Sequence, residues 1–275
     1  MKIRLYSDIH NEFYTQKRRD ARSQDVIQFG WEIPKLEDEM DTVLVLAGDI
    51  WDVYKSMQYA NRLAPRFKAV ILIHGNHEYY KHDITLSSDR AEYLLDDRES
   101  NLYILDDDYI VLDNTLFIGS TLWTDVNGSD YIARLGVGEK MNDYKHIWNS
   151  STNHKLRVDD TILANLAARE FLKKTFCEFA GNEDIKNRVL ITHHAPDIAL
   201  QDRNTDDMSY AFWNTGVDFF HEHTDYWLFG HVHEAWQRDY HGTYYATNCR
   251  GYDISDDYRE VVPGFDPEGL KIVLP

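Results

Sequence analysis

The chain of 275 residues has little cysteine, only Cys177 and Cys249. Two cysteines cannot build a disulfide framework, and their spacing matches no zinc motif, so the sequence favours a reducing, cytoplasmic location. Apolar runs of the roughly 20 residues that a membrane span needs are missing, and the first residues do not resemble a signal peptide. We therefore expect a soluble protein without a membrane partner.

Basic residues are also scarce relative to acidic ones. The sequence has 29 Lys plus Arg against 47 Asp plus Glu, which gives a formal net charge of −18. Non-specific binding to DNA or RNA depends on cationic side chains that neutralise phosphates, so extended nucleic acid is an unfavourable partner. A protein of this charge that handles phosphate has to bring its own cations.

Glycine and proline are few, with 14 and 6 residues, while hydrophobic residues make up 43% of the chain. This composition is typical of a folded globular protein and excludes collagen-like and disordered chains. Repeats, low-complexity tracts and flexible linkers are absent from the sequence. We expect a single domain over residues 1–275.

Continuous apolar runs at 41–49 and 68–76 predict strands that are covered on both faces. The helical spacing of residues 53–66 between them predicts a βαβ unit. Further helices are expected over 86–99 and 159–179, and further strands over 2–7, 102–105, 109–112, 115–120, 188–192, 225–229, 235–240, 243–247 and 270–274. This mixture indicates an α/β or mixed α+β class with buried sheets. The polar, aromatic-rich segments 122–158 and 197–215 fit neither pattern, and we expect a lid or substrate-binding insertion around 122–158.

Polar side chains follow five of the predicted strands at the point where each strand ends. Ligands gather at the carboxyl ends of strands in α/β sheets. Two carboxylates, one amide and at least four imidazoles at such positions are typical of a metal site. The five blocks are Asp8-Ile9-His10, Gly48-Asp49-Ile50-Trp51-Asp52, Gly75-Asn76-His77-Glu78, Thr192-His193-His194-Ala195-Pro196 and Gly230-His231-Val232-His233.

The types of donor atom narrow the choice of metal ion. Oxygen and nitrogen donors without cysteine suit Mn, Fe or Zn better than a thiolate-bound structural zinc. Seven ligands are too many for one ion, so two ions that share a carboxylate are the simplest interpretation. Two ions about 3.5 to 4 Å apart are a common device for in-line attack on phosphorus.

The five blocks together resemble the calcineurin-like metallophosphoesterases, whose signature runs D-x-H, G-D-x-x-D, G-N-H-[DE], H and G-H-x-H. All five stand here in that order, between Asp8 and His233. The resemblance implies a four-layer αββα sandwich, in which two packed β-sheets are flanked by helices. It also implies a phosphoesterase or phosphatase that hydrolyses small phosphodiesters or monoesters through a metal-bridging hydroxide. Mn²⁺ is the favoured ion, and Fe, Zn, Ni or Mg are alternatives.

The same resemblance implies a role for each matching residue. Asp8, His10 and His233 would bind one metal, Asn76, His193 and His231 the other, and Asp49 would bridge both. His77 resembles the catalytic histidine that protonates the leaving oxygen, and Asp52 is placed to orient it. Because His193 and His194 are adjacent, His194 remains an alternative ligand, and Asp52 could instead cap the following helix.

The sequence says less about which residues contact the substrate. The segments 141–144 and 248–252 and the Thr121-Leu122-Trp123 tripeptide resemble a bacterial and phage branch of the family. They make Arg250 a candidate phosphate clamp, and Asn142, Tyr144 and Trp123 candidate substrate contacts, although the aromatic residues could equally serve packing.

Three other functions remain open. Protein serine/threonine phosphatases of this fold carry G-D-x-x-D-R-G, whereas Asp52 is followed here by Val53 and Tyr54. A nuclease would need a basic groove, which the net charge disfavours. A catalytically silent binding module should show gaps in the ligand set, and this sequence shows none.

Overall fold

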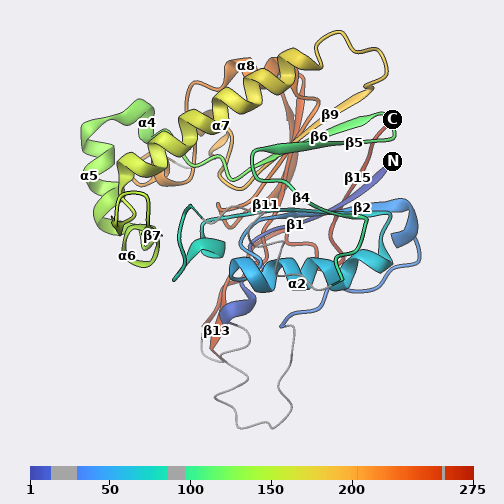
Figure 1. Cartoon of the computed structure of the whole chain (residues 1–275), viewed down its shortest axis with the longest axis horizontal. Coiled ribbons are helices and arrows are strands. Elements are labelled where there is room, and N and C mark those ends of the chain that lie inside the picture. The colour runs from blue at the N-terminus through green and yellow to red at the C-terminus, as the bar shows by residue number, and fades with distance from the viewer. Residues whose placement is uncertain (14–29, 86–96, 203, 256–257) are drawn as a thin grey trace.

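The computed structural model describes residues 1–13, 30–85, 97–202, 204–255 and 258–275 (Figure 1). Its centre is formed by two large mixed sheets. The first has five strands in the order β15-β1-β2-β3-β4. Strands β1 (Lys2–Tyr6), β2 (Thr42–Ala47), β3 (Ala69–Ile73) and β4 (Leu102–Ile104) are parallel, and β15 (Leu270–Val273) lies antiparallel to β1 at the edge.

The second sheet has six strands in the order β11-β12-β10-β9-β6-β5. Its parallel centre is formed by β6 (Thr115–Ser120), β9 (Asn187–Thr192), β10 (Tyr226–Phe229) and β12 (Thr243–Asn248). The two edges are antiparallel strands, β5 (Asp108–Leu112) beside β6 and β11 (Ala235–Tyr240) beside β12.

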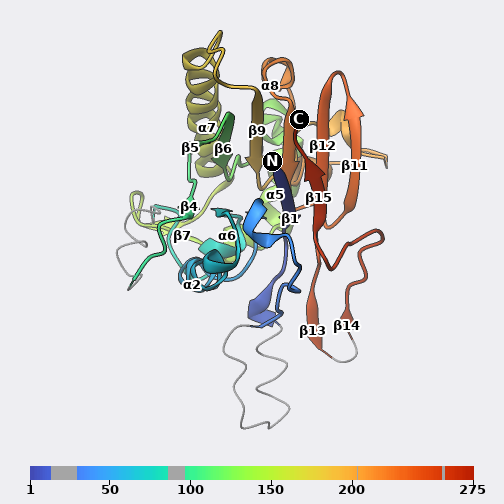
Figure 2. The same cartoon turned by 90° about the vertical axis from the view of Figure 1, so that its right-hand side faces the viewer.

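Helices cover the outer face of each sheet (Figures 1 and 2). On the first sheet this helix is α2 (Val53–Leu63), whose residues Val53, Met57 and Ala60 pack against Leu44 and Leu46 of β2. On the second sheet α7 (Val158–Glu178) and α8 (Asp218–His223) bury apolar residues against β6, β9 and β10. The order of layers is therefore helix, sheet, sheet, helix.

The apolar runs of the sequence explain this layering. Alternate residues of a strand point to opposite faces, so a strand that is apolar throughout must be covered on both sides. In β2, Val43 and Val45 face the second sheet and pack in the same cluster as Phe117 and Ile191. The predicted mixed α/β fold with two packed sheets flanked by helices is confirmed.

The remaining elements are short. The segment 122–158 folds into α4 (Val126–Ser129), α5 (Tyr131–Lys140), α6 (Asp143–His146) and the paired strands β7 (Trp148–Asn149) and β8 (His154–Lys155). A small separate ribbon of β13 (Asp253–Ser255) and β14 (Tyr258–Arg259) lies below the two large sheets in the view of Figure 2. Single 3₁₀ turns occupy Glu39–Asp41, Ala64–Arg66, His77–Tyr79, Ile198–Leu200 and Ser209–Ala211.

Most of the helix expected over 86–99 lies outside the described residues. The other expected strands and helices are present, with ends shifted by a few residues. Within the described part of the chain, no helix is both long enough and apolar enough to cross a membrane.

Candidate metal centre

The predicted ligands lie in the loops that follow β1, β2, β3, β9 and β10, at one edge of the paired sheets. Five of them have left-handed backbone conformations, which non-glycine residues seldom adopt. Such strain costs about 1 to 3 kcal/mol per residue and is concentrated at functional sites. The φ values are 51° for Asp8, 51° for His10, 54° for Asp49, 68° for His231 and 50° for His233.

Two glycines leave room for the carboxylates of the centre. A Cβ on Gly75 would lie 2.2 Å from an Asp49 carboxylate oxygen, and one on Gly230 would lie 2.7 Å from an Asp8 carboxylate oxygen. Both distances are far below a van der Waals contact. The loops after β3 and β10 therefore depend on glycine to let these carboxylates approach the backbone.

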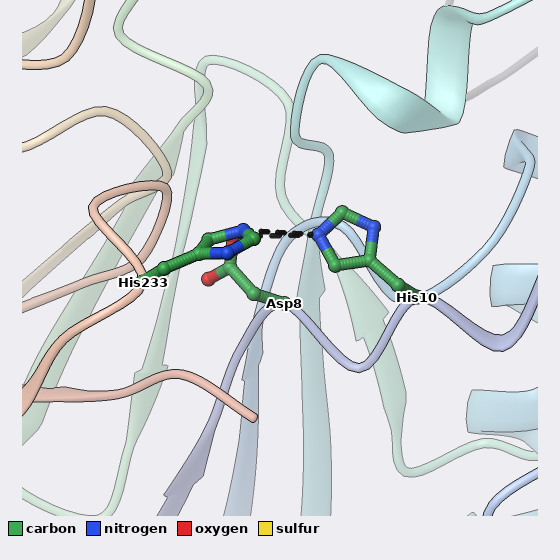
Figure 3. Close-up of side chains that lie close together, drawn as sticks. All are labelled: Asp8, His10 and His233. Atoms are coloured by element: carbon green, nitrogen blue, oxygen red, sulfur yellow. Dashed lines mark hydrogen bonds and ion pairs between the residues drawn. The ribbon is translucent and has the colours of Figure 1, made fainter. Parts of the chain in front are cut away.

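The first group of candidate ligands consists of Asp8, His10 and His233 (Figure 3). The two imidazole Nε2 atoms lie 3.2 Å apart, and Asp8 Oδ1 lies 3.5 Å from the Nε2 of His233 and 3.9 Å from that of His10. These residues come from both sheets, so the centre forms only when the sheets are packed together.

The second group consists of Asp49, His193 and His231, with Asn76 beside them. Nε2 of His193 lies 3.4 Å from Asp49 Oδ1 and 3.0 Å from Asn76 Oδ1. The other carboxylate oxygen of Asp49, Oδ2, lies 3.8 Å from His10 Nε2. Asp49 thus stands between the two groups.

The donors fit divalent cations. Nε2 of His231 is buried and has no hydrogen-bond partner, although an unpaired buried nitrogen is costly unless it binds something. Burial opposes protonation of both His193 and His233. The Asp49 carboxylate outweighs it at His193 and raises that pKa to about 9, and the Asp8 carboxylate outweighs it at His233 and raises that pKa to about 10. The carboxylates therefore attract positive charge to the places where cations would bind.

Further polar contacts orient the ligand side chains. Glu260 accepts a hydrogen bond from Nδ1 of His233 at 2.7 Å, and the Ala47 carbonyl accepts one from Nδ1 of His193 at 2.9 Å. The Asn76 side-chain amide donates to Asp143 at 2.6 Å, which turns its carbonyl oxygen toward His193. Such contacts fix the tautomer and direction of metal-binding side chains.

His77 lies beside the two groups and contacts Glu12. Its Nδ1 is 2.9 Å from a Glu12 carboxylate oxygen, and the ring of Tyr80 stacks on it at 4.0 Å. Burial alone would lower the pKa of His77, but the carboxylates of Asp49 and Glu12 raise it to about 9. Its contact with Glu12 favours the protonated form of the imidazole, which is the form that can donate a proton.

Asp52 does not contact His77 in this structure. Its carboxylate caps α2 by accepting from the backbone N–H of Lys55 at 3.2 Å, and it pairs with the Lys55 ammonium at 2.7 Å. The expected orientation of His77 by Asp52 is replaced by the contact with Glu12, because the first turn of α2 holds the Asp52 side chain.

Glu78 has a structural position behind the ligands. Its carboxylate accepts backbone hydrogen bonds from Asp49, Ile50 and Gly75 at 2.7 to 2.9 Å, and one from the Ser56 hydroxyl. Burial, followed by the nearby Asp49 carboxylate, raises the pKa of Glu78 to about 7. This residue holds the loops after β2 and β3 together.

His194, the alternative to His193, points elsewhere. Its Nδ1 lies 3.2 Å from the Thr121 carbonyl, its ring packs against Trp123, and it belongs to neither ligand group. Burial, reinforced by the charge of His193, lowers the pKa of His194 to about 3. The arrangement favours His193 as the ligand.

A cleft of about 600 Å³ opens over the ligands, and Asn142 is the only one of the four expected substrate contacts that lines it. Trp123 is buried with Tyr79 and Ile147, and the Tyr144 hydroxyl bonds to Thr161. The Arg250 guanidinium donates to the Ile9 carbonyl and to Asp253. The structure therefore does not place Trp123, Tyr144 or Arg250 at the cleft.

Sequence reasoning missed Glu12, Glu260, Tyr80, Asp143 and Tyr252, which contact the predicted ligands or His77. Glu12 lies two residues after His10, the last residue of the first block, so its position in the sequence was a usable signal. Asp143 and Tyr252 lie in the two segments that had been singled out, although without a role. Nothing in the local sequence marks Glu260. It directly follows β14 and contacts His233 only because the folded chain brings the two residues together.

The two-sheet fold and the carboxylate-imidazole centre define a metal-dependent phosphoester hydrolase. Residues 1–235 match the calcineurin-like phosphoesterases, and the chain belongs to this family. Divalent metal ions are accordingly its cofactors. An uncharacterized protein of Acanthamoeba polyphaga mimivirus is 27% identical over 274 residues, with 91% of each chain covered.

A solved structure shares the fold. The phosphopantetheinyl hydrolase PptH of Mycobacterium tuberculosis superposes with a TM-score of 0.60 at 15% identity, over 91% of this chain and 89% of the other. A putative 5′-nucleotidase of Staphylococcus aureus has a TM-score of 0.44 at 13% identity, over 90% of this chain and 48% of the other. At 15% identity the likeness to PptH concerns the fold alone.

Proposed function

We propose that the protein is a dinuclear phosphoesterase that hydrolyses small phosphodiesters. The observation that carries this proposal is the position of Asp49, whose two carboxylate oxygens lie 3.4 Å and 3.8 Å from imidazoles of different ligand groups. A carboxylate between two such groups is suited to bridge two cations. Asp8, His10 and His233 would hold one ion, and Asn76, His193 and His231 the other.

When bound, two divalent cations neutralise charge on the phosphoryl group and lower the pKa of water at the site. Oxygen and nitrogen donors without sulfur suit Mn, Fe or Zn, and of these we propose Mn²⁺, the ion that the family resemblance favours. The chain itself supplies the orientation of the ligands, through Glu260, Ala47 and Asp143, and an acid, His77.

The reaction follows from these positions. Water attacks phosphorus, forms the new P–O bond and releases one proton to the solvent, from which His77 regains a proton after turnover. At the same time the bond to the leaving oxygen breaks and its electron pair moves to that oxygen. His77, whose Nδ1 is hydrogen-bonded to Glu12, gives the leaving oxygen its proton. The products are a phosphomonoester and an alcohol.

The lining of the cleft supports small substrates. Lys140 is the only lysine or arginine among its described lining residues, whereas Asp206 and Glu260 are acidic. A long nucleic acid would place further phosphates along this surface without cations to meet them. Lys140, Met141 and Asn142 come from the segment 122–158, which we propose is the substrate-binding insertion.

Hydrolysis of bis(4-nitrophenyl) phosphate tests the proposal. We expect turnover with added Mn²⁺, loss of turnover after chelation, and much weaker hydrolysis of duplex DNA at the same phosphodiester concentration. Preference for the duplex would favour a nuclease instead, and preference for phosphoserine peptides would favour a protein phosphatase. Full activity of the chelated protein would contradict the proposal.

A further inference from the structure

A second cavity, of about 780 Å³, borders the cleft over the metal centre. Four residues line both spaces: His77, Tyr80, Asn142 and Tyr252. His77 therefore stands on a boundary, with the ligand groups and the cleft on one side and the second cavity on the other. The other residues that line the second cavity are Glu12, Phe13, Trp51, Asp52, Lys55, Lys81, His82, His146 and Ile254. Both of its carboxylates already have cationic or imidazole partners, Glu12 with His77 and Asp52 with Lys55.

The walls of this cavity are largely aromatic. Tyr80 stacks on His77 at 4.0 Å and approaches the ring of His146 at 5.4 Å. The rings of Phe13 and Tyr252 meet at 5.4 Å, and both are only partly buried. Ile254 is 41% exposed beside them. These surfaces can pack against a planar ring.

The cavity also presents Lys81, a cation without a partner among the residues that the structure describes. Lys55 is held by Asp52 and lies over the Trp51 ring, but the Lys81 ammonium makes no ion pair or hydrogen bond with the described residues. The Lys81 backbone is left-handed, with φ of 66°, and its N–H donates to the His146 carbonyl at 2.9 Å. Glycine would adopt this conformation more easily, so the lysine occupies it at a cost.

We propose that the second cavity receives the leaving group of the substrate and selects an aromatic leaving group that carries a negative charge, which Lys81 recognises. The inference rests on the proposed function, because it takes His77 as the proton donor to the leaving oxygen. The substituent on that oxygen extends past His77 into the second cavity. The other substituent remains in the cleft, so the preferred substrate is a diester with two sizeable groups.

Each turnover leaves the aryl alcohol in the second cavity. The P–O bond to the aryl oxygen breaks, its electron pair stays on that oxygen, and His77 supplies the proton. The charged group on the ring takes no part in bond breaking. Its contact with Lys81 therefore changes kcat/KM for charged leaving groups without changing the chemistry for neutral ones.

A pair of substrates tests this inference. Methyl 4-nitrophenyl phosphate has a neutral aromatic leaving group, and methyl 3-carboxy-4-nitrophenyl phosphate has an anionic one. Lys81→Met should lower kcat/KM for the anionic substrate about tenfold, the order expected for one charge contact in a partly exposed site, and change the neutral one less than about twofold. Because each substrate is compared with itself, differences in leaving-group reactivity cancel.

Lys68→Met is the matched control. Lys68 pairs with Asp113 at the start of β3, at the opposite end of the strand from the metal centre. This variant should treat both substrates as the wild type does. Equal effects of Lys81→Met on the two substrates, or no effect on either, would overturn the inference while leaving the proposed function intact.

A binding measurement distinguishes a failure of the proposed function from a failure of the inference about the second cavity. Calorimetry should detect 5-hydroxy-2-nitrobenzoate, the anionic product, binding to the wild type, and about tenfold weaker binding to Lys81→Met. This readout needs no turnover. Failure of the wild type to hydrolyse either ester would contradict the proposed function, whereas absent or Lys81-independent binding of the product would contradict the inference about the cavity.

Discussion

The metal centre and the walls of the cleft are built in different ways. The ligands follow directly after buried strands of both sheets, and their positions are set by strand pairing. The walls come from α5, the 3₁₀ turns of 197–215 and the segment after β12, which are joined by irregular chain. The ligand positions therefore depend on the packed core, while the wall residues that make no contact with a ligand can vary more freely than Glu260 and Asp143, which orient His233 and Asn76.

Replacement of the bridging candidate should produce the largest effect on the centre. Asp49→Asn keeps the size of the side chain but removes the charge that lies between the two ligand groups, so we expect activity to fall by more than about 10³-fold, together with loss of bound metal. Steady-state kinetics with bis(4-nitrophenyl) phosphate and elemental analysis measure the two quantities. Wild-type activity in this variant would remove Asp49 from the bridge.

Replacement of His77, the proposed proton donor, should have the next largest effect. His77→Ala should lower kcat by roughly 10² to 10⁴, the usual contribution of general acid catalysis, and leave metal content near that of the wild type. The loss should shrink for esters with good leaving groups, which need less protonation. If metal is lost with the imidazole, His77 is a ligand.

Glu260 offers a test of the contacts that orient the ligands. Glu260→Gln weakens the acceptor for His233 Nδ1, 2.7 Å away, and should lower metal affinity by about 10- to 100-fold. Saturating Mn²⁺ should restore most of the activity. Titration of activity with Mn²⁺ measures both effects, and an unchanged affinity would show that Glu260 does not support His233.

Glu12 sets the pH dependence of His77. Since Asp49 and Glu12 raise the pKa of His77 to about 9, Glu12→Gln should lower that pKa and reduce the protonated fraction above neutral pH. The alkaline limb of the kcat/KM profile should therefore move to lower pH, with the acid limb little changed by this group. An alkaline limb that stays in place or moves to higher pH would contradict the role of Glu12.

The smallest effect is expected for Tyr144. Its hydroxyl bonds to Thr161 behind the wall, and Tyr144 does not line the cleft. Tyr144→Phe should change kcat/KM by less than about twofold and cost about 0.5 to 1.5 kcal/mol of stability for the lost hydrogen bond. A larger kinetic effect, measured beside the urea midpoint, would return Tyr144 to the substrate contacts expected from the sequence.

The difference between the metal centre and the cleft walls also explains how much of the fold and the site could be predicted from the sequence. Apolar runs such as 41–49 forced strands to be covered on both faces, so the sheets and the positions of Asp8, Asp49 and Asn76 followed from the sequence. The contact of Glu260 with His233 could not be predicted, because the neighbours of Glu260 carry no pattern and the contact exists only in the folded chain. Asp52 illustrates a local competition, since capping of α2 occupied a side chain that the motif alone directed to His77.

The two-metal centre shared by the sheets is tested most directly by metal stoichiometry. Equilibrium dialysis of the wild type against Mn²⁺ should give two ions per chain, and the same measurement on Asp49→Asn should show that tight binding of both ions is lost. His194→Gln, at the buried neighbour of His193, serves as a control that should keep two. One ion per wild-type chain, or two in Asp49→Asn with unchanged affinity, would contradict the dinuclear account.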